Sequence, residues 1–266
     1  MNYKKHWDYS NEGLTELYKR CSSGCHAMEI DALMLTAGAS FEDKTNGMEY
    51  GITILGGTCT ISGDGFSYEH IGKRKNVFDG KAYAVYIPRG KKFTVIADTD
   101  LKAVIAKCPT DYDFEPALIT PDDVIVKNLG KPGFEREAHF IIDERVKAGR
   151  IYIGENFIKG GQWSGFPGHK HDTNKMPTEG FAEEIYYYEY DKPTGYGIQQ
   201  VYTDDREIDD AYTVRNGDLV EIPKGYHPCC VAPGYTGYLL WMMSCDNRGF
   251  YFSVDADQAW QNKKTL

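Results

Sequence analysis

Three histidines and one glutamate are spaced so that they could hold a metal ion. His169 and His171 are separated by one residue, Glu184 begins a run of aromatic residues, and His227 follows a Pro-Lys-Gly turn. Side chains two positions apart in a β-strand point to the same face, so the first two histidines can reach one point. Three imidazoles and one carboxylate suit a divalent transition metal that keeps positions open for water or substrate.

The elements that must position these residues are expected to be short strands. Runs rich in β-branched and aromatic residues alternate with turn residues at spacings of roughly 8–12 residues, which favours an antiparallel sandwich or barrel. The expected strands cover residues 50–55, 58–62, 84–87, 93–96, 102–106, 184–189, 197–202, 219–222 and 237–243. Residues 11–20 are expected to form a short helix instead.

An internal repeat divides this all-β chain into two. Segments from the two halves match without a gap at one constant offset of 135 residues. The matching segments are 85–90 with 220–225, 101–108 with 236–243, and Glu49 with Glu184. Because such self-similarity marks a repeated structural unit, we predict two homologous domains, residues 1–120 and residues 121–266.

The repeat also indicates which glutamate completes the site and which domain carries it. Glu184 is preferred to the nearby Glu179 and Glu183, because it matches Glu49 and because Glu183 would face the opposite side of the strand. The first half has no His-x-His before Glu49, and a lysine stands where His227 stands in the second half. Only the second domain is therefore expected to bind a metal.

The His-x-His pair, the glutamate and the histidine after Ile-Pro-Lys-Gly together resemble the signature of the cupins. These are double-stranded β-helix (jelly-roll) barrels whose mouth holds a metal. A closer resemblance is to the 5-deoxy-glucuronate isomerase family of bacterial myo-inositol catabolism, and it covers nearly the whole chain. The segments that carry it are 84–90, 161–172, 183–188, 217–228 and 232–235. The chain departs from the family pattern at Gln162, Gly165 and Gly168, which could reshape the loop ahead of the metal but leave all four ligands in place.

This resemblance implies a bicupin enzyme, an aldose–ketose isomerase that converts 5-deoxy-D-glucuronate to 5-dehydro-2-deoxy-D-gluconate. It implies one divalent transition metal in the second domain, held by His169, His171, Glu184 and His227. Zn²⁺ is the first expectation, with Mn²⁺, Fe²⁺, Ni²⁺ and Co²⁺ as alternatives, since this ligand set does not choose sharply among them. The partner is then a small sugar acid, and a homo-oligomer is a further expectation.

The isomerisation needs a group that moves a proton or a hydride between C1 and C2, and a cationic or amide partner for the substrate carboxylate. Tyr186 and Tyr188, two and four residues after the glutamate ligand, and a metal-bound water are the candidates for the first task. Gln200, on the next strand, could contact substrate hydroxyls. Arg248 is the candidate for the carboxylate, with Lys224 as the alternative.

Two other functions stay open from the sequence. One is another bicupin sugar-acid enzyme, either a uronate isomerase or a metal dioxygenase, and the other is a non-enzymatic sugar-binding cupin. The long step from His171 to Glu184 speaks against the uronate isomerases, which usually have a compact spacing there. A dioxygenase would consume oxygen, and a binding protein would lack the metal.

Composition limits the partners and suggests a compartment. The 266 residues carry 39 acidic and 30 basic side chains, and this net charge of −9 argues against nucleic acid or an anionic membrane as partner. The N-terminal residues lack the apolar run of a signal peptide, and no apolar run approaches the length of a membrane span. The seven cysteines are interpreted as reduced thiols of a cytoplasmic protein, with a zinc site at Cys21, Cys25 and His26 as the weaker alternative.

Overall fold

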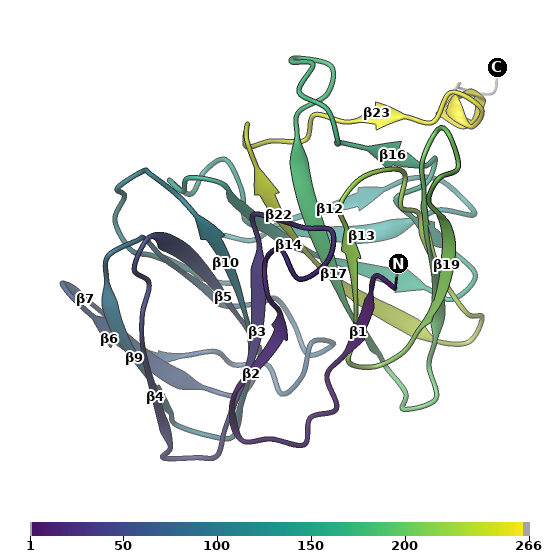
Figure 1. Cartoon of the computed structure of the whole chain (residues 1–266). Coiled ribbons are helices and arrows are strands. Elements are labelled where there is room, and N and C mark those ends of the chain that lie inside the picture. Colours follow the sequence, from purple (N-terminus) through teal and green to yellow (C-terminus); the bar gives the residue numbers. More distant parts are fainter. Residues whose placement is uncertain (1, 263–266) are drawn as a thin grey trace.

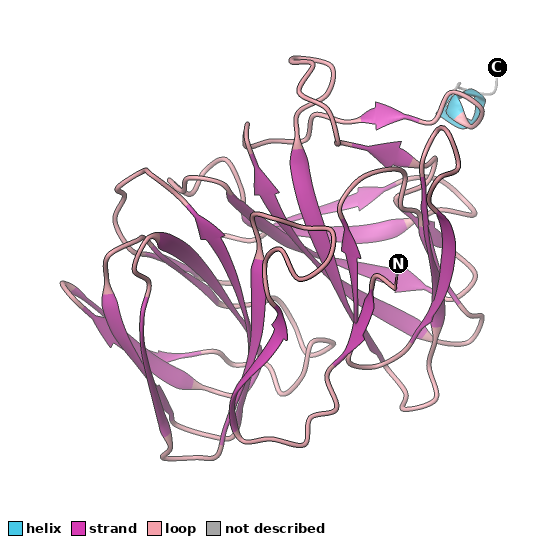
Figure 2. Cartoon of the chain, viewed as in Figure 1, coloured by secondary structure: helices cyan, strands magenta, loops and turns pink. Residues whose placement is uncertain are grey.

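Almost all regular elements of the chain are strands, as Figures 1 and 2 show for the computed structural model, which describes residues 2–262. Within these residues the only helical element is the short 3₁₀ helix η1 (Ala259–Asn262). The strands build two halves that lie side by side in Figure 1, the first purple to blue and the second mainly green to yellow. The predicted all-β fold class is confirmed.

The first barrel is a six-stranded sheet packed on a four-stranded sheet. The larger sheet has the order β11 (Ala117–Ile119), β8 (Ala84–Ile87), β5 (Met48–Gly56), β10 (Leu101–Pro109), β3 (Glu29–Leu35), β2 (Gly13–Tyr18). The smaller sheet has the order β4 (Ser40–Lys44), β9 (Lys92–Ala97), β6 (Cys59–Gly63), β7 (Phe66–Ile71). Apolar side chains such as Ile52, Ile61 and Val95 fill the space between the two sheets.

The second barrel has the same plan with a seven-stranded and a four-stranded sheet. The larger sheet has the order β1 (Lys4–His6), β20 (Asp218–Ile222), β17 (Ala182–Tyr190), β22 (Thr236–Cys245), β14 (Ile151–Lys159), β13 (Arg136–Ile142), β12 (Ile125–Leu129). The smaller sheet has the order β15 (Trp163–Ser164), β21 (Cys229–Val231), β18 (Gly197–Tyr202), β19 (Asp209–Val214). A separate pair, β16 (His169–Lys170) and β23 (Ser253–Val254), lies above this barrel in Figure 1.

The repeat found in the sequence corresponds to the central strands of the two large sheets. The order β8-β5-β10 in the first sheet has its equivalent in β20-β17-β22 in the second, and all these pairings are antiparallel. The division of the chain at residue 120 stays a prediction. Strand β1 crosses that division, because it pairs with β20 and so completes the larger sheet of the second barrel.

The two large sheets pack against each other and form a further apolar core between the barrels. On β17, Tyr186 and Tyr188 belong to the interior of the second barrel, whereas Ile185 and Tyr187 belong to the core between the barrels. A strand that is buried on both faces carries apolar residues at successive positions rather than at alternate ones. This double burial explains the uninterrupted Ile-Tyr-Tyr-Tyr run in the sequence.

The helix expected over residues 11–20 is wrong. Residues 13–18 form the edge strand β2, which pairs antiparallel with β3. The spacing of Leu14, Leu17 and Tyr18 suits a helix face, but a helix of about ten residues is marginal by itself. Pairing with β3 satisfies the backbone groups on one side of this edge strand, and tertiary context overrides the weak local preference.

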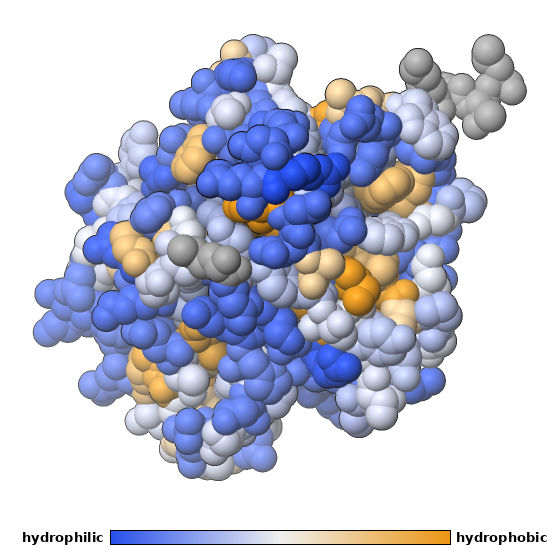
Figure 3. Space-filling view, turned by 45° about the vertical axis from the view of Figure 1, so that its right-hand side comes forward, coloured by the Kyte–Doolittle hydropathy of each residue, from blue (hydrophilic) through white to orange (hydrophobic). Residues whose placement is uncertain are grey.

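The surface agrees with the acidic, polar composition. Figure 3 shows one face of the molecule on which hydrophilic residues dominate and apolar residues form small separate groups. Over the part of the chain that is described, no helix has the length and apolar character needed to cross a membrane.

Candidate metal centre

Strand ends bring the four predicted ligands to one end of the second barrel. β16 carries His169 and leads directly into His171, and β17 begins just before Glu184. β20 pairs antiparallel with β17 so that Glu184 lies opposite Ile222, the last residue of β20. The turn after β20, which leads to His227, therefore starts beside the glutamate.

The four side chains converge. One ring nitrogen from each of His169, His171 and His227 lies within 4.8 Å of the other two, and residues 2–262 contain no other such group of histidine, cysteine or acidic side chains. The alternative zinc site at Cys21, Cys25 and His26 is therefore not formed. Nε2 of His171 and Nε2 of His227 each lie 3.1 Å from Oε2 of Glu184.

Backbone carbonyls fix the orientation of two rings. Nδ1 of His171 lies 2.8 Å from the carbonyl oxygen of Ala182, and Nδ1 of His227 lies 2.9 Å from that of Gly225. A ring that donates through Nδ1 presents the lone pair of Nε2, the form in which imidazole binds a metal. Nε2 of His227 is buried and makes no hydrogen bond, although the Glu184 carboxylate is adjacent. A cation between them would satisfy both groups, so these residues fit a bound metal.

The electrostatics of the four groups also suit ligation. Burial raises the pKa of Glu184, but the adjacent His171 and His227 outweigh burial and lower this pKa to about 2, so the group is a carboxylate at neutral pH. Burial and the two neighbouring imidazoles lower the pKa of His169 well below its ordinary value, which keeps that ring neutral. Burial also lowers the pKa of His171, but the carboxylate of Glu184 more than compensates and raises it. A bound metal would replace that proton.

The segment between His171 and Glu184 is organised by Glu179. The carboxylate of Glu179 is buried and accepts hydrogen bonds from the backbone N–H groups of Asp172 and the residue after it, at 3.1 and 2.8 Å. Asp172 in turn accepts a hydrogen bond from the backbone N–H of Gly225 at 2.8 Å. The long step between two of the ligands is therefore an ordered loop that is tied to the turn before the third histidine.

Two glutamates related to the predicted ligand Glu184, its neighbour Glu183 and its repeat equivalent Glu49, connect the two barrels. Glu183 accepts hydrogen bonds from the backbone N–H groups of His26 and Ala27 in the first barrel. Glu49, the repeat-related residue, accepts hydrogen bonds from the backbone N–H groups of residues 149–151 in the second half. In the first barrel the position equivalent to Glu184 thus serves the contact between the barrels.

The predicted tyrosines face the barrel interior, beside a glutamine that was not predicted from the sequence. The ring of Tyr186 lies 5.8 Å from the ring of His227, and the hydroxyl of Tyr188 donates to Oε1 of Gln199. Gln199 also donates to the backbone carbonyl of His227 at 2.9 Å. Gln200, which we expect from the sequence to face the substrate, is the neighbour of buried Gln199 on β18 and therefore points to the opposite face.

The two cations predicted for the substrate carboxylate are engaged within the protein. Arg248 donates to the backbone carbonyls of Ile151 at 3.0 Å and Val146 at 2.7 Å. Lys224 is exposed and forms an ion pair with Glu207 at 3.1 Å. Arg248 therefore stabilises the segment ahead of β14, and its role in binding the substrate stays a prediction.

The loop ahead of His169 is closely packed, which gives a steric reason for two of its glycines. A Cβ atom at Gly168 would lie 2.6 Å from the hydroxyl of Tyr202. Gly165 has a φ of +63°, in the left-handed region that favours glycine, and a Cβ there would lie 3.5 Å from Cε1 of His169. Gln162 accepts hydrogen bonds from two backbone N–H groups in the segment after β12.

Two cupin-like barrels with a single candidate metal centre define a bicupin. The chain belongs to the KduI/IolB family, which it matches over residues 4–261. It is 36% identical over 244 residues to the 5-deoxy-glucuronate isomerase of Bacillus licheniformis, covering 91% of this chain and 90% of that one. It is 34% identical over 235 residues to the protein of the same name from Bacillus subtilis strain 168, covering 88% and 87%. The family resemblance stated from the sequence is confirmed.

Solved structures agree on the fold. An IolB-like protein from Salmonella typhimurium LT2 superimposes with a TM-score of 0.94 at 30% identity and covers 99% of this chain and 100% of that one. The oxalate decarboxylase of Lactobacillus farciminis, in its formate complex, gives a TM-score of 0.68 at 12% identity, with 96% and 88% covered. At that identity the second likeness speaks for the fold alone, and it confirms the predicted cupin architecture.

Proposed function

We propose that this protein is an aldose–ketose isomerase that converts 5-deoxy-D-glucuronate to 5-dehydro-2-deoxy-D-gluconate in myo-inositol catabolism. The observation that carries the proposal is the convergence of three imidazoles on one carboxylate, in a chain whose relatives bear the name 5-deoxy-glucuronate isomerase. The substrate is accordingly a small sugar acid. The cytoplasmic location is part of the proposal, and the seven free thiols support it.

The proposed metal ligands are His169, His171, Glu184 and His227, with Zn²⁺ as the first candidate. When bound, a divalent cation would act as a Lewis acid toward the carbonyl and the adjacent hydroxyl of the sugar. The residues contribute two features of their own. Glu184 is a carboxylate at neutral pH because its pKa is lowered to about 2, and backbone carbonyls hold the rings of His171 and His227 in position.

Tyr186 is the proposed proton-transfer group nearest to the centre. Burial raises the pKa of Tyr186 well above its ordinary value, and the charge of Glu184 adds to the effect, so the phenol keeps its proton. It can therefore hold or donate a proton at its hydroxyl. Tyr188 has its hydroxyl engaged by Gln199, which suits a positioning role better than proton transfer.

The test is to follow purified protein, loaded with one equivalent of metal, on 5-deoxy-glucuronate by NMR. We expect loss of the C1 aldehyde signals and appearance of a C2 ketone, with His169→Ala and Glu184→Gln reduced at least about 100-fold. Tyr186→Phe is expected to lower kcat by about 100-fold while metal content stays unchanged. Absence of any conversion by the metal-loaded wild type would refute the proposal, and oxygen uptake in its place would indicate a dioxygenase.

A further inference from the structure

A sugar acid needs a cation at the far end of the site from the reacting carbons. The chain carries a net charge of −9, so its overall field opposes an anionic substrate and the site must supply positive charge locally. Arg248 and Lys224 have their donors engaged by backbone carbonyls and by Glu207. A cation whose donors are free of such partners is therefore a better candidate for the substrate carboxylate.

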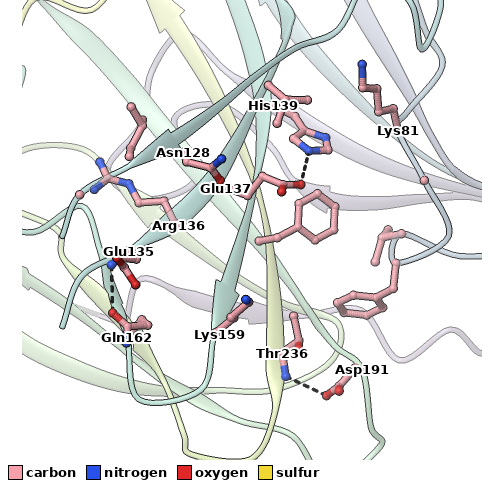
Figure 4. A pocket seen from close by; sticks show the side chains of 17 residues that line it. Lys81, Asn128, Glu135, Arg136, Glu137, His139, Lys159, Gln162, Asp191 and Thr236 are labelled. Carbon is pink, nitrogen blue, oxygen red and sulfur yellow. Dashed lines mark hydrogen bonds and ion pairs between the residues drawn. The ribbon is translucent and has the colours of Figure 1, made fainter. Parts of the chain in front are cut away.

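Arg136 begins strand β13 on the strand face that lines the second barrel. Ala138 and Phe140, two and four residues further on, belong to the core of that barrel, and the Phe140 ring lies 6.0 Å from that of Trp241. Since side chains two apart share a strand face, Arg136 points to the same interior. Both Arg136 and His139 border a groove on the outer side of the sheet, and in Figure 4 the guanidinium of Arg136 points away from His139.

The guanidinium of Arg136 has no acceptor within the protein. No carboxylate, carbonyl or hydroxyl among residues 2–262 forms a hydrogen bond or an ion pair with it, although the residue is only partly exposed. Arg74 and Arg150, by contrast, pair with Glu155 and Asp246 at 2.6 Å. A partly buried cation without a partner is costly unless a ligand supplies the negative charge.

The charge of Arg136 is directed at the candidate metal centre. Burial lowers the pKa of Arg136, and the neighbouring Tyr186 and Cys229 oppose this effect. In the other direction, Arg136 is one of the charges that lower the pKa of His169, after burial and the other two imidazoles. The guanidinium thus faces the same interior as one metal ligand and the proposed proton-transfer tyrosine.

We propose that Arg136 binds the carboxylate of the sugar-acid substrate and so selects acidic over neutral sugars. This inference rests on the proposed isomerase function. The planar guanidinium can form two parallel hydrogen bonds with a carboxylate, which fixes the orientation of the substrate as well as its affinity. With the carboxylate at Arg136, the carbonyl end of the substrate would face the same barrel interior as the histidine cluster.

The test compares Arg136→Met and Arg136→Lys with the wild type on 5-deoxy-glucuronate and on its neutral analogue 5-deoxy-glucose. Arg136→Met is expected to raise KM for the acid by at least about 30-fold, because it removes a charge-assisted pair. The kcat/KM for the neutral sugar is expected to be lower than that for the acid in the wild type. Arg136→Met should change the value for the neutral sugar by less than about threefold. Arg136→Lys should restore part of the preference for the acid, since it returns the charge without the planar fork.

Lys159→Met is the matched control, because it removes one positive charge from the exposed end of the adjacent strand β14. It should leave the ratio of acid to neutral turnover unchanged. An equal loss on both sugars in Arg136→Met, or loss of its metal, would overturn the inference and leave the isomerase proposal standing. If the wild type does not isomerise the acid, calorimetry measures the acid as an unreacted ligand. An unchanged Kd in Arg136→Met, or no binding at all, then refutes the role of Arg136 as well.

Discussion

Glu49 should stabilise the contact between the two barrels through its charge. Its carboxylate is fully buried, accepts backbone hydrogen bonds from Gly149 at 2.7 Å and Ile151 at 2.8 Å, and accepts a third from Arg150. The hydroxyl of Tyr86 donates to it as well, at 2.8 Å. The substitution Glu49→Gln keeps the shape of the side chain and removes one acceptor oxygen together with the charge.

The expected cost follows from these contacts. The Tyr86 hydroxyl can turn to accept from the new amide, but the N–H of Gly149 beside it then loses its acceptor, which costs about 1–3 kcal/mol. The remaining N–H groups exchange a charged acceptor for a neutral one, at about 1 kcal/mol each. We expect a total near 4 kcal/mol, which corresponds to a fall of roughly 10 °C in Tm for a chain of this size.

The assay is differential scanning calorimetry of Glu49→Gln beside Glu42→Gln. Glu42 lies exposed on β4, the strand that precedes β5 in the chain, so the control removes the same charge without removing a buried acceptor. The control should change Tm by no more than about 2 °C. If Glu49→Gln matched its control, the carboxylate would not stabilise the contact between the barrels, and our explanation of the repeat would be wrong at this position.

Three further predictions concern the surroundings of the metal centre. Gly168→Ala should lower Tm because its Cβ meets the Tyr202 hydroxyl, and Tyr202→Phe should recover part of the loss in a double-mutant cycle; additive losses would contradict the clash. Gln199→Leu should cost about 2–4 kcal/mol in chemical denaturation, since it strips buried partners from Tyr188 and from the His227 carbonyl. Because the pKa of Glu184 is about 2, the carboxylate stays charged from pH 7 to pH 4, and loss of metal affinity there follows imidazole protonation. Glu184→Gln should bind metal more weakly, and its affinity should begin to fall at a lower pH than in the wild type, because the carboxylate that raises the pKa of His171 is gone. A competing chelator measures the affinity, and a fall that begins at the same or a higher pH would contradict this coupling.

The sequence predicted the parts of the fold and the site that depend on local pattern. The His169-x-His171 pair, the offset of 135 residues and the buried aromatic run after Glu184 all reflect strand periodicity, which can be followed residue by residue. The choice of Glu184 over Glu183 depended on the same alternation. The structure puts Glu184 at 3.1 Å from two imidazoles and Glu183 against the first barrel.

Features that depend on tertiary partners could not be predicted in this way. On β18 the alternation was ambiguous, because Ile198 and Tyr202 make the register of Gln200 look more apolar than that of Gln199, which is the buried one. Nothing local shows that Arg248 meets backbone carbonyls a hundred residues away, or that Arg136 meets none. Whether a charged residue is engaged depends on the packing of distant strands.

We propose that one metal, bound only in the second barrel, enables the isomerisation. The most direct test measures metal content and turnover of 5-deoxy-glucuronate together, in wild type and His227→Ala. We predict about one equivalent of divalent transition metal per chain in the wild type, loss of turnover on chelation and its return with stoichiometric metal. His227→Ala should hold less than about a tenth of an equivalent and stay inactive. Wild-type turnover by the chelated protein, or full metal content in His227→Ala, would contradict the account.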